Sequence, residues 1–172
     1  YLFLNEPPEE ELNIPFFRTN KRDVQKVSLN VYHTVQTLQD RQSWLTNYLT
    51  ENDYDDLGFV GSFDKNESYR EIVSHIRKNL ELNEDWAKEF KTWEETLDYL
   101  TRKIEDIGVI VTFNGVVGNN TRRKIDVDEC RGFVLVNKKA PFLFINSADA
   151  KGAQMFTLIH EIAHIWLGES AG

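Results

Sequence analysis

The sequence is poor in cysteine and has no long apolar run. Cys130 is the only cysteine among 172 residues, so the chain cannot form an internal disulfide. No apolar stretch approaches the roughly 20 residues of a membrane-spanning helix, and no charged-then-apolar signal peptide opens the chain. These absences predict a cytoplasmic location in a reducing compartment, with no membrane association.

Basic residues are in the minority. The chain has 20 lysines and arginines against 28 aspartates and glutamates, which gives a formal net charge of −8 at pH 7. A nucleic-acid-binding surface needs clustered cations, so we expect no direct nucleic-acid binding by this segment. Hydrophobic residues make up 41% of the chain, which is enough for a folded core. Nothing in the sequence indicates an oligomeric state.

The ends of the sequence suggest a segment of a longer protein. It begins with Tyr1 rather than methionine, and it stops four residues after Gly168. Gly168 closes the most informative stretch of the chain, so we expect further functional residues outside this segment.

That stretch is the apolar segment 156–168, which contains the motif H-E-x-x-H at residues 160–164. Its apolar flanks and its terminal Gly168 predict a buried helix with a glycine C-cap. Four residues are slightly more than one helical turn. His160 and His164 therefore lie on one face of the helix, about 6 Å apart along its axis.

This spacing suits a metal site. Two imidazoles so placed can both bind one zinc ion, with Zn–N bonds of roughly 2.0–2.1 Å. Zinc lowers the pKa of a bound water to about 7, and an adjacent glutamate can take its proton as general base. We therefore predict His160 and His164 as metal ligands and Glu161 as the catalytic residue.

The alternative is a pair of core histidines without a metal. The motif arises by chance in about one chain in a few hundred of this length, but mostly on exposed helices of mixed composition. Here it interrupts an apolar helix, where each unpaired buried polar group costs roughly 1–3 kcal/mol. A metal ion is the simplest partner for these groups.

Helical patterns dominate the first half of the chain. Prolines and acidic residues predict an extended, mostly irregular segment over residues 1–27. Apolar residues recurring at three- and four-residue steps predict a long amphipathic helix over 28–52. Capping boxes at residues 68–71 and 92–95 predict the starts of two further helices, with a short helix or turn over 83–90 between them.

The second half changes to strand patterns. Apolar and β-branched runs predict strands at residues 109–113, 132–136 and 142–146. We expect Ser147 or Asp149 to cap the helix that carries the H-E-x-x-H motif. The basic cluster at 122–124 is interpreted as a solvated loop, with contact to an acidic partner as the alternative.

The order of three helices, three strands and a final helix predicts an α+β fold. A helical N-terminal half is followed by a small β-sheet packed on the H-E-x-x-H helix. We divide the chain into a mainly helical N-terminal region, residues 1–90, and a peptidase core, residues 91–172, truncated after the active-site helix. One continuous domain is the alternative.

The strand 142–146 and the helix segment 153–164 resemble the ImmA/IrrE family of zinc metallopeptidases. In that family, an apolar strand ending in asparagine precedes a helix whose centre reads close to F-T-L-x-H-E-x-x-H. The resemblance takes in residues 131–133 and 118–122, and it is most specific over 105–168.

The first part of the chain looks like the longer members of this family, through its motifs at 15–19 and 41–45. In those members, an Xre-type helix-turn-helix precedes the peptidase part, and no such DNA-binding unit is recognisable in this sequence.

The resemblance implies a thermolysin-like zincin core with Zn2+ as cofactor. It assigns the zinc ligands to His160 and His164 and the general base to Glu161. The third ligand of the family is a glutamate on a later helix, which we expect beyond Gly172, with Glu169 as a weaker alternative. Manganese or iron would also tolerate two imidazoles and a carboxylate.

The implied activity is limited proteolysis of a regulatory protein. Typical targets of the family are repressors of mobile elements or of stress responses, so the expected partner is a DNA-binding repressor. We expect the sheet edge at Phe142–Asn146 to bind the substrate as an added strand. Arg131 is a candidate for stabilising the oxyanion, and a structural ion pair is its alternative role.

Two rival functions stay open. One is a catalytically inactive zincin-fold module for sensing or binding. The other is the effector domain of a helix-turn-helix transcriptional regulator. A metal assay separates the first rival from the peptidase, and the net charge of −8 argues against DNA binding by these residues themselves.

Overall fold

A computed structural model describes residues 27–171 of the chain. The predictions for residues 1–26 lie outside the described residues. The rest has the predicted α+β character, with these elements in chain order: α1 (Leu29–Glu51), α2 (Tyr69–Asn79), the 3-10 helix η1 (Trp86–Glu89), α3 (Trp93–Asp106), β1 (Ile110–Phe113), β2 (Val116–Val117), β3 (Asn120–Lys124), β4 (Gly132–Leu135), β5 (Phe142–Ile145) and α4 (Lys151–Leu167).

The main sheet has the strand order β1-β5-β4. β1 runs parallel to β5, with Ile110 opposite Phe142, and β4 runs antiparallel to β5, with Gly132 opposite Ile145. β5 is therefore the central strand. The prediction that residues 142–146 form a substrate-binding edge is wrong, because both sides of β5 already pair with other strands.

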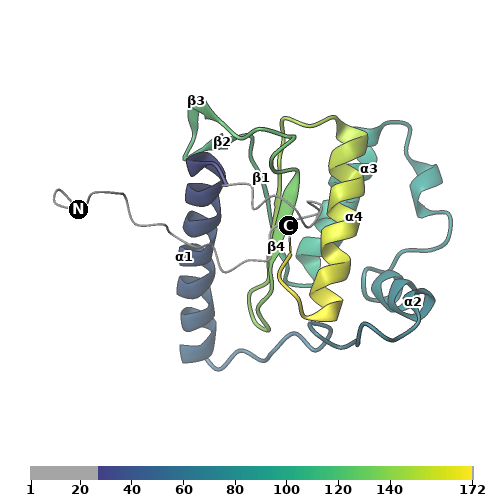
Figure 1. Ribbon diagram of the computed structural model, residues 1–172. Coiled ribbons are helices and arrows are strands. Elements are labelled where there is room, and N and C mark those ends of the chain that lie inside the picture. The colour runs from purple at the N-terminus through teal and green to yellow at the C-terminus, as the bar shows by residue number, and fades with distance from the viewer. Residues whose placement is uncertain (1–26, 172) are drawn as a thin grey trace.

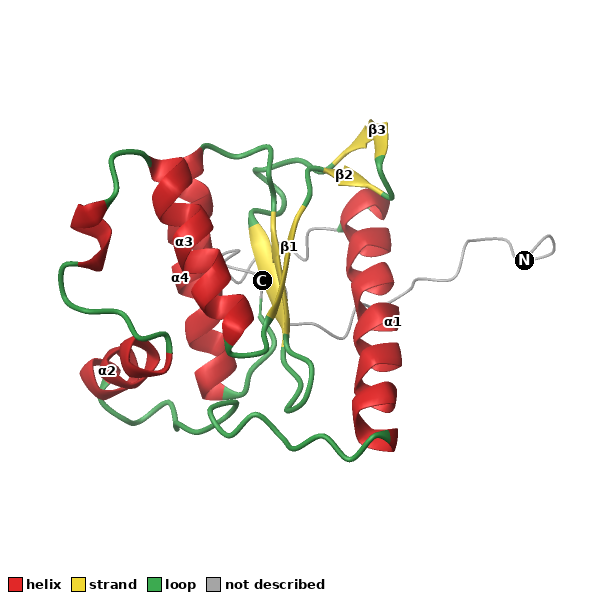
Figure 2. Ribbon diagram, turned by 180° about the vertical axis from the view of Figure 1, so that it is seen from behind, coloured by secondary structure: helices red, strands yellow, loops and turns green. Residues whose placement is uncertain are grey.

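Helices cover both faces of this sheet. Figures 1 and 2 show α1 on one side of it and α3 and α4 on the other. Along β5, alternate side chains enter the two cores: Phe142 and Phe144 pack with the apolar face of α1, while Leu143 and Ile145 pack with α3 and α4. Burial on both faces explains why β5 is a continuous apolar run rather than an alternating one.

The core beside α4 also takes residues from the first half of the chain. Phe59, Val60 and Leu80 are buried in it together with Trp166 of α4. The rings of Phe59 and Trp166 stack with their centroids 4.6 Å apart. The division of the chain at residue 90 stays a prediction.

The capping signals had mixed outcomes. At α3, Thr92 and Glu95 form the predicted capping box, with both reciprocal hydrogen bonds present. At α2, Ser68 is the N-cap residue, but its side chain makes no capping hydrogen bond. The helix is in the predicted place, but the predicted box is not formed.

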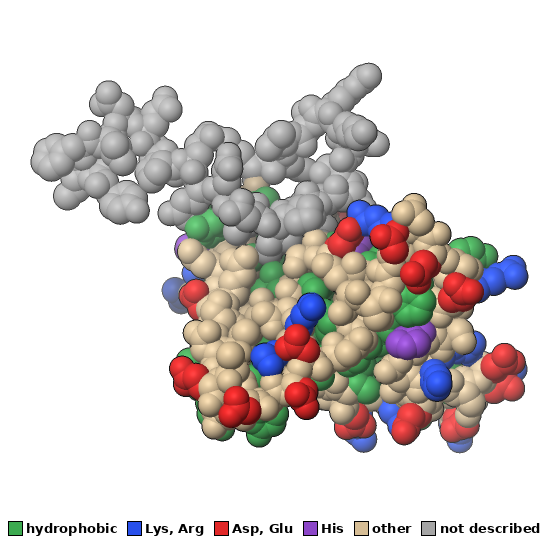
Figure 3. Space-filling model, turned by 90° about the horizontal axis from the view of Figure 1, so that it is seen from below, with side chains coloured by type: hydrophobic (Ala, Val, Ile, Leu, Met, Phe, Trp, Pro, Cys, Tyr) green, Lys and Arg blue, Asp and Glu red, His purple; other side chains and the backbone are tan. Residues whose placement is uncertain are grey.

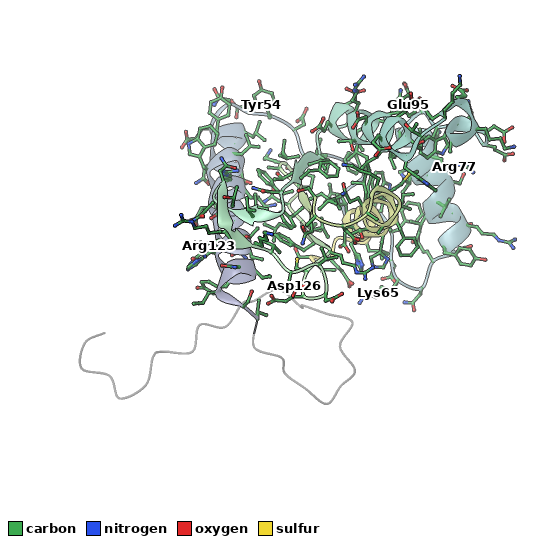
Figure 4. The ribbon with its side chains drawn as sticks, turned by 90° about the horizontal axis from the view of Figure 1, so that it is seen from above. Tyr54, Lys65, Arg77, Glu95, Arg123 and Asp126 are labelled. Carbon is green, nitrogen blue, oxygen red and sulfur yellow. The ribbon has the colours of Figure 1, made fainter. Side chains whose placement is uncertain are left out.

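The basic cluster at residues 122–124 is not a loop, as predicted, but part of β3. This strand pairs with β2 in a two-stranded antiparallel sheet. Its residues are mostly exposed, yet Arg123 donates to Asn30 Oδ1 at 3.1 Å and to His33 Nδ1 at 2.7 Å. Figure 4 shows Arg123 on the α1 side of the molecule. The strand was missed because it presents polar side chains to solvent and buries none.

None of the helices over residues 27–171 combines the length and the apolar character that crossing a membrane requires. On the face seen from below, acidic side chains are interspersed with basic ones (Figure 3). The prediction of a cytoplasmic location stays a prediction.

Candidate metal site on helix α4

Helix α4 carries the H-E-x-x-H motif, and its C-terminus is fixed by a glycine. Gly168 adopts φ +72°, the left-handed conformation that glycine enters at least cost, and its N–H bonds back to the carbonyls of His164 and Ile165. The sequence predicted this C-cap correctly.

The loop at residues 59–63 completes that end of the helix. The last carbonyls of a helix have no partner within it and need donors from elsewhere. Gly61 N–H donates to Ile165 O at 2.9 Å, and Phe63 N–H donates to Trp166 O at 3.1 Å. The histidine-bearing half of α4 is thus held by a segment about a hundred residues earlier in the chain.

The N-terminus of α4 is organised differently from the prediction. The N-cap residue is Ala150, and neither Ser147 nor Asp149 caps the helix through its side chain. Instead, the buried side chain of Gln154 reaches back, and its Nε2 donates to Ser147 O at 3.1 Å and to Asp149 O at 2.6 Å. Asn146 Nδ2, at the end of β5, donates to Cys130 O at 2.9 Å and so ties the preceding loop to the same region.

The two histidines of the motif point toward one another. His160 Nε2 and His164 Nε2 lie 3.4 Å apart, and their ring planes make an angle of 74°. Two nitrogen ligands of one tetrahedral zinc ion, with bonds of roughly 2.0–2.1 Å, lie about 3.3–3.4 Å from each other. The imidazole pair therefore has the separation that two ligands of one zinc ion require.

Glu161 lies on the side of α4 that faces the sheet. Its side chain is only 5% exposed. Burial raises the pKa of the Cys130 thiol to about 12. The negative charges of the Glu129 and Glu161 carboxylates contribute to the same upward shift. Glu161 therefore lies on the buried face of α4, in the same helix as the half-buried histidine pair.

Residues 27–171 do not complete a three-ligand site. Among them, no group of three or more histidine, cysteine, aspartate or glutamate side chains is arranged to hold a metal ion. Glu169, the alternative third ligand, instead forms an ion pair with Lys65, with Nζ and Oε1 2.8 Å apart. Figure 4 shows Lys65 beside α4.

The other two histidines have structural contacts. His33 is half-buried, and its Nδ1 lies 2.7 Å from the guanidinium of Arg123. His75 accepts a hydrogen bond from Trp166 Nε1 at 2.9 Å and so joins α2 to α4. A contact between residues 91 positions apart leaves no local signal in the sequence, so periodicity and motifs could not reveal it.

An α+β domain with two convergent imidazoles and a buried glutamate on one helix has the features of a metallopeptidase-like domain. Residues 104–172, about two fifths of the chain, match the family model Peptidase_M78, described as the IrrE N-terminal-like domain. This match confirms the family resemblance predicted from the sequence. Neither the curated proteins nor the solved structures contain a match to the chain.

Proposed function

We propose that this chain is the catalytic part of a metal-dependent endopeptidase, with zinc as its metal. The observation that carries the proposal is the 3.4 Å separation of His160 Nε2 and His164 Nε2 on the helix that also carries the buried Glu161. The match of residues 104–172 to a peptidase family supports the same conclusion.

In this proposal, His160 and His164 hold the cation. A divalent cation held there would act as a Lewis acid on the peptide carbonyl. Glu161 takes a proton from the attacking water and later delivers it to the leaving amide nitrogen. Its burial shields the proton transfer from bulk water. The third protein ligand comes from outside residues 27–171, and the family resemblance puts it beyond Gly172.

The geometry of the sheet suggests where an extended substrate would bind. β4 is an edge strand of the main sheet, and α4 packs against it. β1, the other edge strand, packs against α3 instead. We therefore assign substrate pairing to β4 rather than to β5. A strand added there gives main-chain hydrogen bonds independent of side-chain sequence.

The proposed substrate is a regulatory protein, specifically a DNA-binding repressor, cleaved at a limited number of positions. This assignment rests on the resemblance to the ImmA/IrrE family. The net charge of −8 suits a partner with a basic surface, and DNA-binding proteins use lysine and arginine side chains to contact phosphates.

Metal content is the first test. The full natural protein would be dialysed, and its zinc measured by elemental analysis in the wild type and in His160→Ala, His164→Ala and His33→Ala variants. We expect close to one zinc per wild-type chain, with loss in the first two variants. His33 is the matched control, because it is also half-buried but contacts Arg123, so its variant should keep the metal.

Glu161→Gln tests catalysis separately from metal binding. The variant keeps the shape of the side chain but cannot accept the proton, so it should retain zinc and lose peptide cleavage. A protein that binds no zinc even when zinc is supplied would contradict the peptidase. It would favour the second candidate, a binding or sensing module.

A further inference from the structure

The outer edge of β4 is partly occupied by the chain itself. After α4, the chain turns back and Ala171 pairs with Val134 in an antiparallel bridge. Val134 N–H donates to Ala171 O at 2.7 Å, and Ala171 N–H donates to Val134 O at 3.3 Å. One step further along, Val136 N–H donates to Ser170 Oγ at 2.9 Å. We name residues 170–171, the segment that follows α4, the tail; the name denotes this segment and not a chain terminus.

The tail takes the positions that an added strand needs. Along an antiparallel strand, main-chain groups point alternately toward one neighbour and the other. Because Val134 points away from β5, Gly132 and Val136 point the same way. Both main-chain groups of Val134 and the N–H of Val136 are bonded to the tail. Of the three outward-pointing residues Gly132, Val134 and Val136, Gly132 is the one to which no hydrogen bond from residues 170–171 is directed.

This edge lies next to the proposed catalytic helix. A Cβ placed on Gly132 would come within 2.6 Å of Thr157 Cγ2, so β4 and α4 touch there almost without side chains between them. Glu161 follows Thr157 by one helical turn on the same face of α4. The paired segment of β4 therefore runs alongside the turn of α4 that carries Glu161.

We propose that the tail is an internal substitute for a substrate strand, and that it must leave β4 before an extended peptide can pair there. This inference rests on the proposed peptidase function. Val134 can exchange its two main-chain hydrogen bonds with only one strand at a time, so tail and peptide exclude each other. The tail runs antiparallel to β4, in the direction available to an added antiparallel peptide.

Within residues 27–171, the tail is held by main-chain and side-chain hydrogen bonds to β4 and by the packing of one small side chain, Ala171. Besides the three hydrogen bonds to β4, the described contacts at this point are the packing of half-buried Ala171 against the core beside α4, the hydrogen bond from Glu169 N–H to His164 O at 3.1 Å, and the ion pair of Glu169 with Lys65. Both side chains of that pair are largely exposed, at 42% and 66%, and exposed ion pairs add little stability. The tail thus resembles a reversible cover more than a permanent strand of the sheet.

Two variants of the full natural protein, loaded with zinc, would weaken the tail. Ala171→Pro removes the N–H that bonds to Val134 O, and Ser170→Ala removes the acceptor for Val136 N–H. Fluorescein-labelled casein, an unfolded protein, serves as the probe of peptide cleavage. We expect each variant to cleave it about fivefold faster than the wild type, the factor that one lost net hydrogen bond gives. Ser43→Ala, an exposed serine on α1, is the matched control and should leave the rate unchanged.

Amide hydrogen exchange at Val134 reports on the pairing independently of activity. We expect faster exchange in Ala171→Pro, and unchanged exchange there would overturn the pairing itself. Accelerated exchange with an unchanged or slower cleavage rate would overturn the tail as a cover. Failure of the proposed function has a different signature: no zinc is bound, or the wild type and Glu161→Gln give the same rate.

Discussion

Gly61 and Gly168 pack against each other through their α-carbons. A Cβ built on Gly168 would lie 3.0 Å from the Cα of Gly61, and both residues have positive φ, +72° and +66°. The contact lets the 59–63 loop reach the last carbonyls of α4, where Gly61 N–H donates to Ile165 O at 2.9 Å. Two glycines far apart in sequence therefore set the position of the helix end nearest His164.

This contact predicts that Gly168→Ala is more destabilising than its backbone conformation alone requires. A non-glycine residue at positive φ costs about 1–2 kcal/mol, and the backbone of Gly61 cannot move aside without losing its bond to α4. We expect a loss of about 2–3 kcal/mol in the free energy of unfolding, measured by thermal denaturation. Gly118→Ala is the control, since it shares the positive φ but has open space around its Cβ. Equal losses in the two variants would contradict the contact.

Gly132 tests the close approach of β4 and α4. An added Cβ would meet Phe144 O at 2.7 Å and Thr157 Cγ2 at 2.6 Å, and the carbonyl belongs to the central strand. We expect Gly132→Ala to destabilise the protein by about 2–3 kcal/mol or more, through overpacking in a tight core. The free energy of unfolding is measured by urea denaturation. Gly58→Ala is the control and should lose less stability, because a Cβ added there has no neighbour within 4 Å. A tolerated Gly132→Ala would show that strand and helix can separate readily.

The two predicted capping boxes give a paired experiment. Thr92→Ala removes a capping hydrogen bond to Glu95 N–H at 3.2 Å and should cost about 1 kcal/mol. Ser68→Ala should cost close to nothing, because the Ser68 side chain makes no capping bond in the structure. Equilibrium unfolding of both variants checks this difference. A larger loss at Ser68 would mean that α2 is capped in solution as its sequence suggests.

The buried thiol predicts a loss of stability at high pH. The folded state raises the pKa of Cys130 from 9.0 to about 12, so between these values the folded protein keeps a proton that the unfolded chain releases. Stability linked to this thiol is therefore constant below about pH 9 and falls as the pH rises toward 12. Unfolding measured from pH 8 to 11 should show a steeper decline in the wild type than in Cys130→Ala. Parallel curves would contradict the shift.

Local signals predicted most of the elements in the described chain. The periodicity of residues 28–52 located α1, and the box at Thr92 fixed the start of α3. The histidine spacing also anticipated the convergent Nε2 atoms of His160 and His164. These features depend on residues within a turn or two of one another, where sequence spacing translates directly into geometry.

What escaped prediction depends on partners far along the chain. The place of β5 at the centre of the sheet is decided by β1 and β4 together, and no property of residues 142–146 distinguishes a central from an edge strand. Gln42 is a further case, because its Nε2 donates to both Leu135 O and Ala140 O and so fixes α1 on the β4–β5 turn. Such long-range hydrogen bonds carry no periodic signal.

The central position of β5 also has a consequence for synthesis of the protein. Both neighbours of β5 precede it in the chain, so neither edge of the main sheet can pair until residues 142–145 have left the ribosome. Until then, α1 and α3 have no sheet on which to bury their apolar faces. The nascent chain therefore exposes those faces until β5 emerges, a state in which chaperone binding competes with aggregation. The strand that closes the sheet immediately precedes the helix with the histidines, so the proposed metal site and its supporting core form almost together.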